Sequence, residues 1–420
     1  MTFIIFMVLL LLSVPIGVSL ILTSIYYIWS SGNIVLFSSF SQQLFGSVEN
    51  YGLMAIPLFI LAGELMNAGG LTQRLINFSR IFFGGFRGGL AYINLLANMF
   101  MAAILGSAVA QIAIMSQSIV PEMEKEGYDK GFATALTAVS GLMGAIIPPS
   151  MMFVIYGVLA QISIGDMFTA GIIPGILMGL SILLVVFLIG IKQQYPKGEW
   201  LKPEAMLQAT VRALPALSIP FIIIGGILSG LTTPTESAAV ASFVALLVGV
   251  FFYKDLSWSV LPKILERTAI STAMVLFLVA AAGVFGWTIT FEQIPQMVAV
   301  WIGKSTSSPF VFLMLVCVLL LLIGMVIDGI AALILVVPIL LPIAINDFGI
   351  NPFHFGVLIC LVLVLGLLTP PVGTGLFVAA SLTGVSIGRL LKMLFPFLLI
   401  TVVVIVLLSY FPVLSTALIQ

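Results

Sequence analysis

The sequence carries very little charge for its length. Only 7% of its 420 residues are Asp, Glu, Lys or Arg, and 61% are hydrophobic. Soluble domains carry about a quarter of their residues as charged side chains. The 15 acidic and 15 basic residues balance, which excludes a basic nucleic-acid-binding surface and an acidic tail. The composition therefore indicates an integral membrane protein, with the lipid bilayer as its solvent.

Side chains that bind transition metals or perform covalent chemistry are also scarce. The two cysteines, Cys317 and Cys360, lie in apolar runs, and His354 is the single histidine. These numbers exclude a disulfide framework and a clustered His or Cys metal site. The phosphate-binding pattern GxxxxGK[ST] does not occur, so ATP hydrolysis by that route is not expected.

Long uncharged runs are abundant. Residues 1–48, 88–121, 131–165, 348–388 and 393–420 contain no Asp, Glu, Lys or Arg. Each run exceeds the roughly 20 residues that cross a bilayer as a helix. We therefore expect an all-α polytopic protein with about 10 to 12 crossings, rather than a barrel of ~10-residue alternating strands. The apolar start MTFIIFMVLLLL lacks a basic n-region, so we expect a retained span, either continuous to Trp29 or broken at Pro15.

Nearly all basic residues fall on one side of the membrane if residues 88–121 and 305–345 are re-entrant helical hairpins. Each hairpin would enter and leave on its own side, the two from opposite sides. In that arrangement Lys304 is the single basic residue on the other side. The basic side then holds fourteen residues: Arg74, Arg80, Arg87, Lys125, Lys130, Lys192, Lys197, Lys202, Arg212, Lys254, Lys263, Arg267, Arg389 and Lys392. Because basic residues concentrate on the cytoplasmic side of membrane proteins, this asymmetry favours re-entrant hairpins over full crossings.

The two halves of the chain carry a matching series of residues. Residues 107–121 align with 328–342 at an offset of 221. One inserted residue then raises the offset to 222, at which Gly144 aligns with Gly366. The two Pro-Pro pairs of the chain, Pro148-Pro149 and Pro370-Pro371, also coincide. Since basic residues flank the first hairpin and not the second, the repeats are expected to be inverted relative to the membrane. That architecture is typical of secondary transporters.

The expected boundaries follow from this alignment. Residues 1–190 form the first repeat, with a hairpin at about 88–122 and a broken helix at about 131–163. Residues 191–212 form a solvated cytoplasmic linker with a short helix. Residues 213–420 form the second repeat, with a hairpin at about 305–345 and a broken helix at about 353–385.

The Pro-Pro pairs predict unwound helices at membrane depth. Proline has no N–H and clashes with the preceding turn, so carbonyl groups before each pair lose their helical partners. Such carbonyls are tolerated in a membrane only where they line a polar cavity or hold an ion. The hairpin tips add glycine-rich turns with one polar side chain each, Ser107 and Asp328. We therefore expect a Na⁺ or H⁺ site in each repeat.

An anion is expected at the same depth. The second arm of each hairpin begins near Val109 or Gly329, and helix N-termini attract negative charge. No Lys or Arg lies in these segments, so carboxylate recognition must rest on N–H groups, bound cations and polar side chains. Candidate side chains are the hydroxyls of Ser107, Thr369 and Thr374 and the amide of Gln111.

The remaining acids admit more than one role. Asp328 is the deepest carboxylate and is either functional, a helix cap, or both. Glu236 follows Pro234 and Thr235, as expected for the first turn of a helix, and Glu64 is expected to be an interfacial contact. An intramembrane hydrolase would need a second carboxylate beside Asp328, and Glu236 is expected near the opposite helix end. A passive channel fits two opposed hairpins less well than a carrier.

At these residues the sequence resembles the large membrane subunit of tripartite ATP-independent periplasmic (TRAP) transporters. The resemblance covers essentially the whole chain. It rests on IPLFILAGELMNAGG (56–70), GGLAYINLLANMFMAAILGSAVA (88–110), IVPEMEKEGYDKGFATALTA (119–138), GAIIPPS (144–150), LTTPTESAAVA (231–241), IDGIAALILVVPILLPIA (327–344) and GLLTPPVGTGLF (366–377).

The resemblance implies an elevator-type Na⁺ symporter, and not an enzyme, in the inner membrane of a bacterium. It implies a separate four-helix small membrane subunit and a periplasmic substrate-binding protein as partners. Carried over by motif position, the first Na⁺ site involves Gly106, Ser107, Gly144 and Ile147. The second Na⁺ site involves Gly324, Asp328, Gly366, Thr369 and Val372, and the substrate site involves Ser107, Gln111, Pro149, Ser150 and Thr374.

The expected function is Na⁺-coupled uptake of a small organic acid, such as sialic acid or a C4-dicarboxylate, delivered by the binding protein. The alternative is a stand-alone carboxylate carrier, coupled to Na⁺ or H⁺, that works without a binding protein.

Overall fold

The computed structural model describes residues 2–12, 14–32, 34–193, 195, 198, 200–303 and 306–419. Within these ranges all regular structure is helical and no strand occurs, which confirms the expected all-α class. Met1, Lys197 and Lys304, which enter the sequence arguments above, lie outside the described residues.

Among the described residues up to 159 there are twelve helical elements. They are α1 (Thr2–Leu11), α2 (Ile16–Ser30), α3 (Leu36–Gly46), η1 (Tyr51–Met54), α4 (Ala55–Ala68), α5 (Leu71–Phe83), α6 (Gly89–Leu105), α7 (Ala108–Ser118), α8 (Val120–Lys125), α9 (Lys130–Gly141), η2 (Leu142–Ala145) and α10 (Met151–Leu159).

The remaining elements begin with the long helix that follows the first break. They are α11 (Ile164–Lys192), α12 (Pro203–Leu228), α13 (Pro234–Leu247), η3 (Val248–Phe252), α14 (Leu261–Phe291), α15 (Ile294–Gly303), α16 (Pro309–Gly324), α17 (Gly329–Asn346), α18 (Pro352–Gly366), α19 (Thr374–Thr383), α20 (Ile387–Tyr410) and α21 (Val413–Thr416).

Several of these elements are long and apolar enough to cross a membrane. Among the described residues there are seven such segments of at least 18 residues: 51–68, 164–191, 203–228, 234–252, 261–291, 329–346 and 387–410. Of the shorter apolar helices, α6, α16, α18 and α19 belong to the hairpins and broken helices. The N-terminal apolar run is broken, because α1 ends at Leu11 and Pro15 immediately precedes α2.

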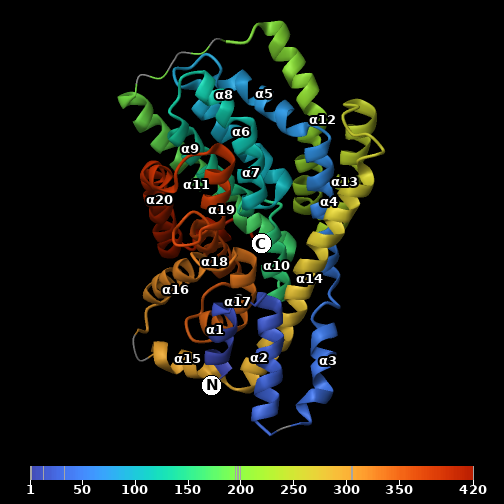
Figure 1. Cartoon of the computed structure of the whole chain (residues 1–420), viewed down its shortest axis with the longest axis vertical. Helices are drawn as coiled ribbons and strands as arrows, with labels where there is room; N and C mark the ends of the chain where they lie inside the picture. Colours follow the sequence, from blue (N-terminus) through green and yellow to red (C-terminus); the bar gives the residue numbers. More distant parts are fainter. Residues whose placement is uncertain are drawn as a thin grey trace.

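One side of the molecule is a group of long helices. In Figure 1, α4, α12, α13 and α14 run roughly parallel along the right of the molecule. Helix α13 packs against α4 and α12, while α14 packs against α2 and α4. The hairpins and broken helices lie beside this group, toward the left and centre of Figure 1.

Each expected hairpin is a pair of helices joined by a short turn. Helices α6 and α7 meet at Gly106 and Ser107, and α16 and α17 are joined by residues 325–328. Each Pro-Pro pair interrupts a helix: α9 and η2 end before Pro148, and α18 ends at Gly366, before Pro370. Both Pro-Pro peptide bonds are cis.

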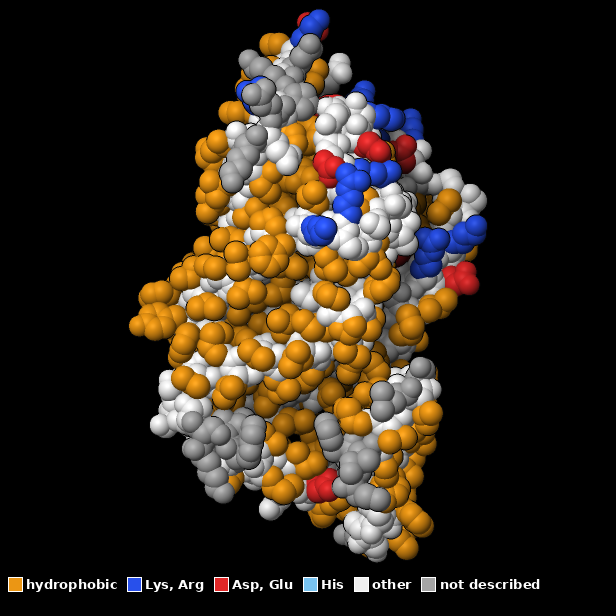
Figure 2. Space-filling view, turned by 60° about the vertical axis from the view of Figure 1, so that its left-hand side comes forward, with side chains coloured by type: hydrophobic (Ala, Val, Ile, Leu, Met, Phe, Trp, Pro, Cys, Tyr) orange, Lys and Arg blue, Asp and Glu red, His pale blue; other side chains and the backbone are white. Residues whose placement is uncertain are grey.

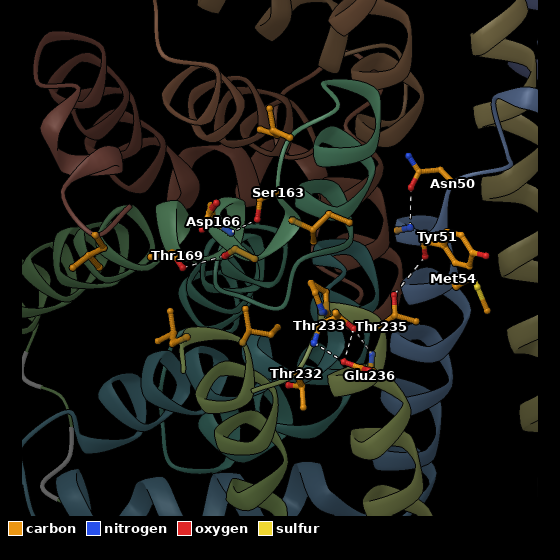
Figure 3. A pocket seen from close by; sticks show the side chains of 18 residues that line it. Asn50, Tyr51, Met54, Ser163, Asp166, Thr169, Thr232, Thr233, Thr235 and Glu236 are labelled. Carbon is orange, nitrogen blue, oxygen red and sulfur yellow. Dashed lines mark hydrogen bonds between the residues drawn. The ribbon is translucent and has the colours of Figure 1, made fainter. Parts of the chain in front are cut away.

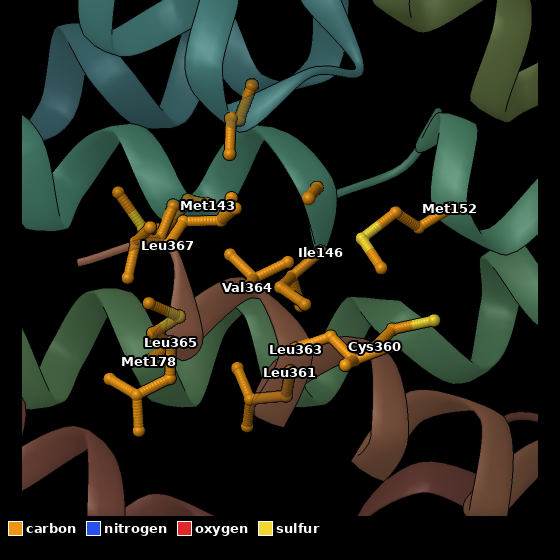
Figure 4. Close-up of a cluster of buried hydrophobic side chains, with 14 of the residues drawn as sticks. Met143, Ile146, Met152, Met178, Cys360, Leu361, Leu363, Val364, Leu365 and Leu367 are labelled. Atoms are coloured by element: carbon orange, nitrogen blue, oxygen red, sulfur yellow. The ribbon is translucent and has the colours of Figure 1, made fainter. Parts of the chain in front are cut away.

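The two sets of elements interlock. The helix after the first break, α10, packs against α17 of the second hairpin, and the helix after the second break, α19, packs against α7 of the first. Between them the broken helices share a core in which Met143 and Ile146 face Val364 and Leu367 of the second break (Figure 4). Because these side chains are buried, the two breaks are held as one packed unit.

The linker between the halves differs from the expected loop with a separate short helix. Helix α11 continues to Lys192, and residues 203–212 are the first turns of the long helix α12. Pro203 suits the first turn of a helix, where its missing N–H has no partner to lose. Between the helices, the ring of Tyr195 is 6% exposed and stacks on Tyr128 at a centroid distance of 4.7 Å.

The basic residues visible in Figure 2 gather toward one end of the molecule. Figure 2 shows Lys and Arg side chains together near the top of the view, above a broad apolar surface. Arg74 pairs with Asp255 and Arg80 with Glu122, each at 2.7 Å. Such partly exposed surface pairs add about 1 kcal/mol or less each. Their location agrees with the asymmetry that the sequence predicts.

Candidate functional site

The first hairpin tip is tied to the first Pro-Pro break through the backbone. Gly106 has a φ of 61°, in the left-handed region that glycine adopts without strain. Its carbonyl oxygen accepts a hydrogen bond of 3.2 Å from the N–H of Met151, just beyond the break. A Cβ atom at Gly144 would lie 3.2 Å from the carbonyl oxygen of Ser107. Gly106, Ser107 and Gly144, all expected in the first ion site, are therefore neighbours.

Within this break the prolines remove two donors. Pro148 and Pro149 cannot donate to the carbonyls of Gly144 and Ala145, four residues earlier. The hydroxyl of Ser150 takes over one of these roles and donates to Ala145 O at 2.5 Å. Its oxygen also caps α10, by accepting from Phe153 N at 3.4 Å. The structure therefore places Ser150, 1% exposed, as a bridge across the break.

The second tip repeats the relation to its own break. The carbonyl oxygen of Met325 accepts from the N–H groups of Val372 and Gly373, at 3.0 and 3.2 Å. Gly324 and Gly366 pack so closely that a Cβ at Gly366 would lie 2.7 to 2.9 Å from Gly324 backbone atoms. Glycine at position 366 is thus required for the contact, whereas a Cβ at Gly324 would lie 3.2 Å from its nearest neighbour, the carbonyl oxygen of Leu363.

The polar side chains of this second region have defined local roles. Asp328 is exposed and caps α17, because its Oδ2 accepts from Ile330 N at 3.0 Å. The Thr369 hydroxyl donates to the carbonyl oxygen of Gly366 at 2.9 Å, a group that Pro370 cannot serve. Thr374 Oγ1 is buried and has no hydrogen-bond partner in the described part of the chain.

Both tips open onto one cavity of about 600 Å³ between the hairpins and the long helices. Ser107 and Asp328 line it from the tips, with Glu64 and Asn67 of α4 and Ser271 of α14 on the other side. The structure therefore brings together the polar residues of both tips. The described lining of this cavity does not include four residues expected to bind substrate: Gln111, Pro149, Ser150 and Thr374.

Glu64 is the residue whose position the sequence did not suggest. It was expected at an interface, yet it faces the cavity that Ser107 and Asp328 line. Its Oε2 atom lies 3.9 Å from Nη1 of Arg267 on α14. The available signal was the spacing of Glu64 and Asn67, because residues three apart share one face of a helix.

A second pocket of about 880 Å³ lies where η1 and the ends of α11, α12 and α13 meet (Figure 3). Glu236 lines it, and Thr233 and Glu236 form a reciprocal capping box at the start of α13. The N–H of Thr233 donates to Glu236 Oε2 at 2.8 Å. The helix-cap interpretation of Glu236 is confirmed. Glu236 lines a different pocket from Asp328, so it does not supply the second carboxylate that the hydrolase alternative needs.

The groups around the tips and breaks are suited to a hard cation. They are carbonyl, hydroxyl, amide and carboxylate oxygens, the ligands that small hard cations prefer. No cluster of three or more His, Cys, Asp or Glu side chains occurs among the described residues. The buried oxygen of Gln111, which lacks a hydrogen-bond donor, is a further observation in favour of an ion.

The fold and this site define a polytopic helical transporter. The model of the family described as "Tripartite ATP-independent periplasmic transporter, DctM component" matches residues 3–414, and the chain belongs to this family. It is accordingly a TRAP transporter large permease, a multi-pass protein of the bacterial inner membrane.

Two relatives and one solved structure illustrate the similarity. The chain is 37% identical to the C4-dicarboxylate TRAP transporter large permease protein DctM of Pseudomonas aeruginosa, over 92% of this chain and 91% of that one. It is 37% identical to the sialic acid TRAP transporter large permease protein SiaM of Vibrio cholerae, over 96% and 94%. The Alcanivorax borkumensis YdaH transporter has a similar fold, with a TM-score of 0.64, 17% identity, and coverage of 91% and 89%.

Proposed function

We propose that this permease takes up a small organic acid by Na⁺ symport. A periplasmic substrate-binding protein delivers the acid, and a separate four-helix small membrane subunit completes the complex. Sialic acid and C4-dicarboxylates are the substrate classes we favour, because relatives named for transport of each are 37% identical to this chain.

The observation that carries the proposal is the shared cavity of the two hairpin tips. Ser107 and Asp328 line it together, and each tip accepts backbone hydrogen bonds from the segment after its own Pro-Pro pair. An ion bound between a tip and a break therefore lies next to the substrate cavity. Binding of the ion and binding of the substrate are then coupled through the same backbone segments.

The charges of the cavity favour cation coupling for an anionic substrate. Its described lining contains two acids, Glu64 and Asp328, and no Lys or Arg; Arg267, outside the lining, lies 3.9 Å from Glu64 and leaves Asp328 without a basic partner among the lining residues. A carboxylate that enters such a cavity is repelled unless cations bind first, because like charges at close range in a low dielectric are strongly unfavourable. Sodium ions at the two tips would supply that positive charge, together with the N-termini of α7 and α17.

For the transport cycle we propose an elevator movement. Hairpins α6–α7 and α16–α17 and the two broken helices would move together, because α10 packs on α17 and α19 packs on α7. The long helices α4, α12, α13 and α14 would form the stationary scaffold with the small subunit. The arrangement of the chain as two inverted repeats, 1–190 and 213–420, is part of this proposal.

The test is uptake into proteoliposomes that contain the chain and its small subunit. Labelled N-acetylneuraminate and succinate are supplied separately, with and without the cognate binding protein, under an inward Na⁺ or K⁺ gradient. We expect uptake of one acid that requires both the binding protein and Na⁺. Full-rate uptake without the binding protein would establish the stand-alone carrier instead, and equal uptake in both gradients would contradict Na⁺ coupling.

A further inference from the structure

A chain of four buried polar side chains runs from α9 to the first hairpin tip. Thr137, Asn94, Asn98 and Gln111 are each 0% exposed. The links measure 2.7 Å between Asn94 Nδ2 and Thr137 Oγ1, 2.8 Å between Asn98 Nδ2 and Asn94 Oδ1, and 2.9 Å between Gln111 Nε2 and Asn98 Oδ1. So many connected amides inside an apolar bundle require a specific explanation, because buried polar groups are retained only where they are satisfied or functional.

The direction of every link follows from the hydroxyl at one end. Thr137 donates its single proton to the carbonyl oxygen of Ala133 at 2.8 Å, so it can only accept from Asn94. Asn94 must therefore present its NH₂ group to Thr137 and its oxygen to Asn98.

The same reasoning continues along the chain. Asn98 presents its NH₂ group to Asn94 and its oxygen to Gln111, so Gln111 must present its NH₂ group to Asn98. A second bond agrees, because Gln111 Nε2 also donates to the backbone carbonyl oxygen of Asn98 at 2.7 Å. The remaining atom, Gln111 Oε1, points away from the chain of amides.

This oxygen is directed at the first break. It is buried and has no hydrogen-bond partner among the described residues. A Cβ atom at Gly144 would overlap it, and the same Cβ position is 3.2 Å from the Ser107 carbonyl oxygen. Gln111 Oε1 and Ser107 O therefore both lie close to the backbone of Gly144, in the first break. The carbonyl oxygen of Gly144 also lacks its usual helical donor, because Pro148, four residues later, has no N–H.

We propose that Gln111 Oε1 is a ligand of the cation in the first repeat, and that Asn98, Asn94 and Thr137 are positioning residues that fix its direction. An amide oxygen without a donor is unfavourable when buried and becomes favourable when it contacts a hard cation. Gln111 would thus act on the ion and not on the substrate, whose cavity lining does not include it. The inference rests on the proposed Na⁺ coupling.

The test measures binding without transport. The thermal unfolding midpoint of the chain with its small subunit is titrated with NaCl, with KCl added to constant ionic strength. Gln111→Met removes the oxygen at similar size, and Gln117→Met, at an exposed position of the same helix α7, is the matched control. We expect the Na⁺ concentration at half-maximal stabilisation to rise at least tenfold in Gln111→Met and to stay unchanged in Gln117→Met.

A second variant separates positioning from folding. Thr137→Val keeps the shape of the side chain and removes the acceptor that orients Asn94. We expect it to raise the half-maximal Na⁺ concentration several-fold, with little further effect when combined with Gln111→Met. If the four hydrogen-bonded side chains serve only the fold, Thr137→Val will lower the unfolding midpoint equally in NaCl and KCl and leave its Na⁺ dependence unchanged. If Gln111→Met does not fold, Gln111→Glu keeps Oε1 and replaces the NH₂ group by a second oxygen. Because that group titrates, we expect Na⁺ binding to become pH-dependent.

The outcomes distinguish this inference from the proposed function. If the wild-type chain shows no Na⁺-specific stabilisation, the coupling ion is wrong and the inference is wrong with it. If the wild type is stabilised by Na⁺ and Gln111→Met is stabilised at the same half-maximal Na⁺ concentration, only the assignment of Gln111 is overturned. The same holds if Gln111→Glu replaces it in the test and its half-maximal Na⁺ concentration does not depend on pH.

Discussion

The N–H of Met151 donates a hydrogen bond of 3.2 Å to the carbonyl oxygen of Gly106, across the gap between the first Pro-Pro pair and the first hairpin tip. Gly373, two residues after the second Pro-Pro pair, donates to Met325 of the second tip at the same distance. In both halves of the chain, therefore, a backbone hydrogen bond links the tip to the segment after the break. A movement of a tip must move the interrupted helix with it.

The close contact of Gly324 with Gly366 leads to a first prediction. We expect Gly366→Ala to abolish uptake and to destabilise the protein by about 1 to 3 kcal/mol, because the new methyl group would overlap Gly324 backbone atoms. Gly388→Ala in α20 is the control, since nothing lies within 4 Å of its Cβ position. Thermal unfolding and proteoliposome uptake measure both effects. Normal uptake by Gly366→Ala would show that the contact is dispensable.

The hydroxyl groups at the two proposed ion sites give a second prediction. We expect Ser107→Ala and Thr369→Ala each to weaken the Na⁺ dependence of stability more than the stability measured in KCl. Thr383→Ala is the control. Like the hydroxyl of Thr369, the hydroxyl of Thr383 donates to a backbone carbonyl oxygen, that of Ala379 at 2.7 Å, but it lies at the far end of α19. Na⁺ titration curves that coincide with wild type in both variants would contradict the assignment of these residues.

Asp328 allows its two roles to be separated. Asp328→Asn keeps a side-chain oxygen that can cap α17 but removes the charge, whereas Asp328→Ala removes both. We expect both variants to lose Na⁺-dependent stabilisation, and only Asp328→Ala to lose a further ~1 kcal/mol in KCl, the usual contribution of an N-cap. Unchanged Na⁺ binding in Asp328→Asn would mean that the carboxylate serves the helix alone.

Glu236 should behave as a structural residue. Glu236→Ala removes one half of the capping box, so we expect a lower unfolding midpoint in both NaCl and KCl. The half-maximal Na⁺ concentration should stay at the wild-type value, because Glu236 lines a different pocket from Ser107 and Asp328. A large shift in Na⁺ dependence would place Glu236 in the ion pathway instead.

The tips and breaks could be predicted from the sequence because their signals are local. Glycine and proline determine backbone conformation within a few residues, so the unwound segments near Pro148 and Pro370 can be predicted from the amino-acid sequence alone. The capping roles of Asp328 and Glu236 are equally local. Each depends on residues at most three positions away.

The surroundings of the site could not be predicted in this way. Asn94 and Thr137 are 43 residues apart, and their hydrogen bond depends on how α6 packs against α9. Glu64 lines the same cavity as Ser107 and Asp328 because of how α4 packs against α6, a relation between helices that no short motif predicts. The short helix expected in the linker proved to be the start of α12, because nothing in the residues after Pro203 ends a helix there.

The most direct test of the central claim is the thermal unfolding midpoint of the wild-type chain with its small subunit, titrated with NaCl against KCl at constant ionic strength. A ligand that binds only the folded state stabilises it by RT ln(1 + [L]/Kd), so Na⁺ at ~100 times its Kd should add about 2.7 kcal/mol per site. We predict a saturable rise specific to Na⁺. Identical curves in the two salts would contradict the proposal that the hairpin tips and Pro-Pro breaks hold Na⁺.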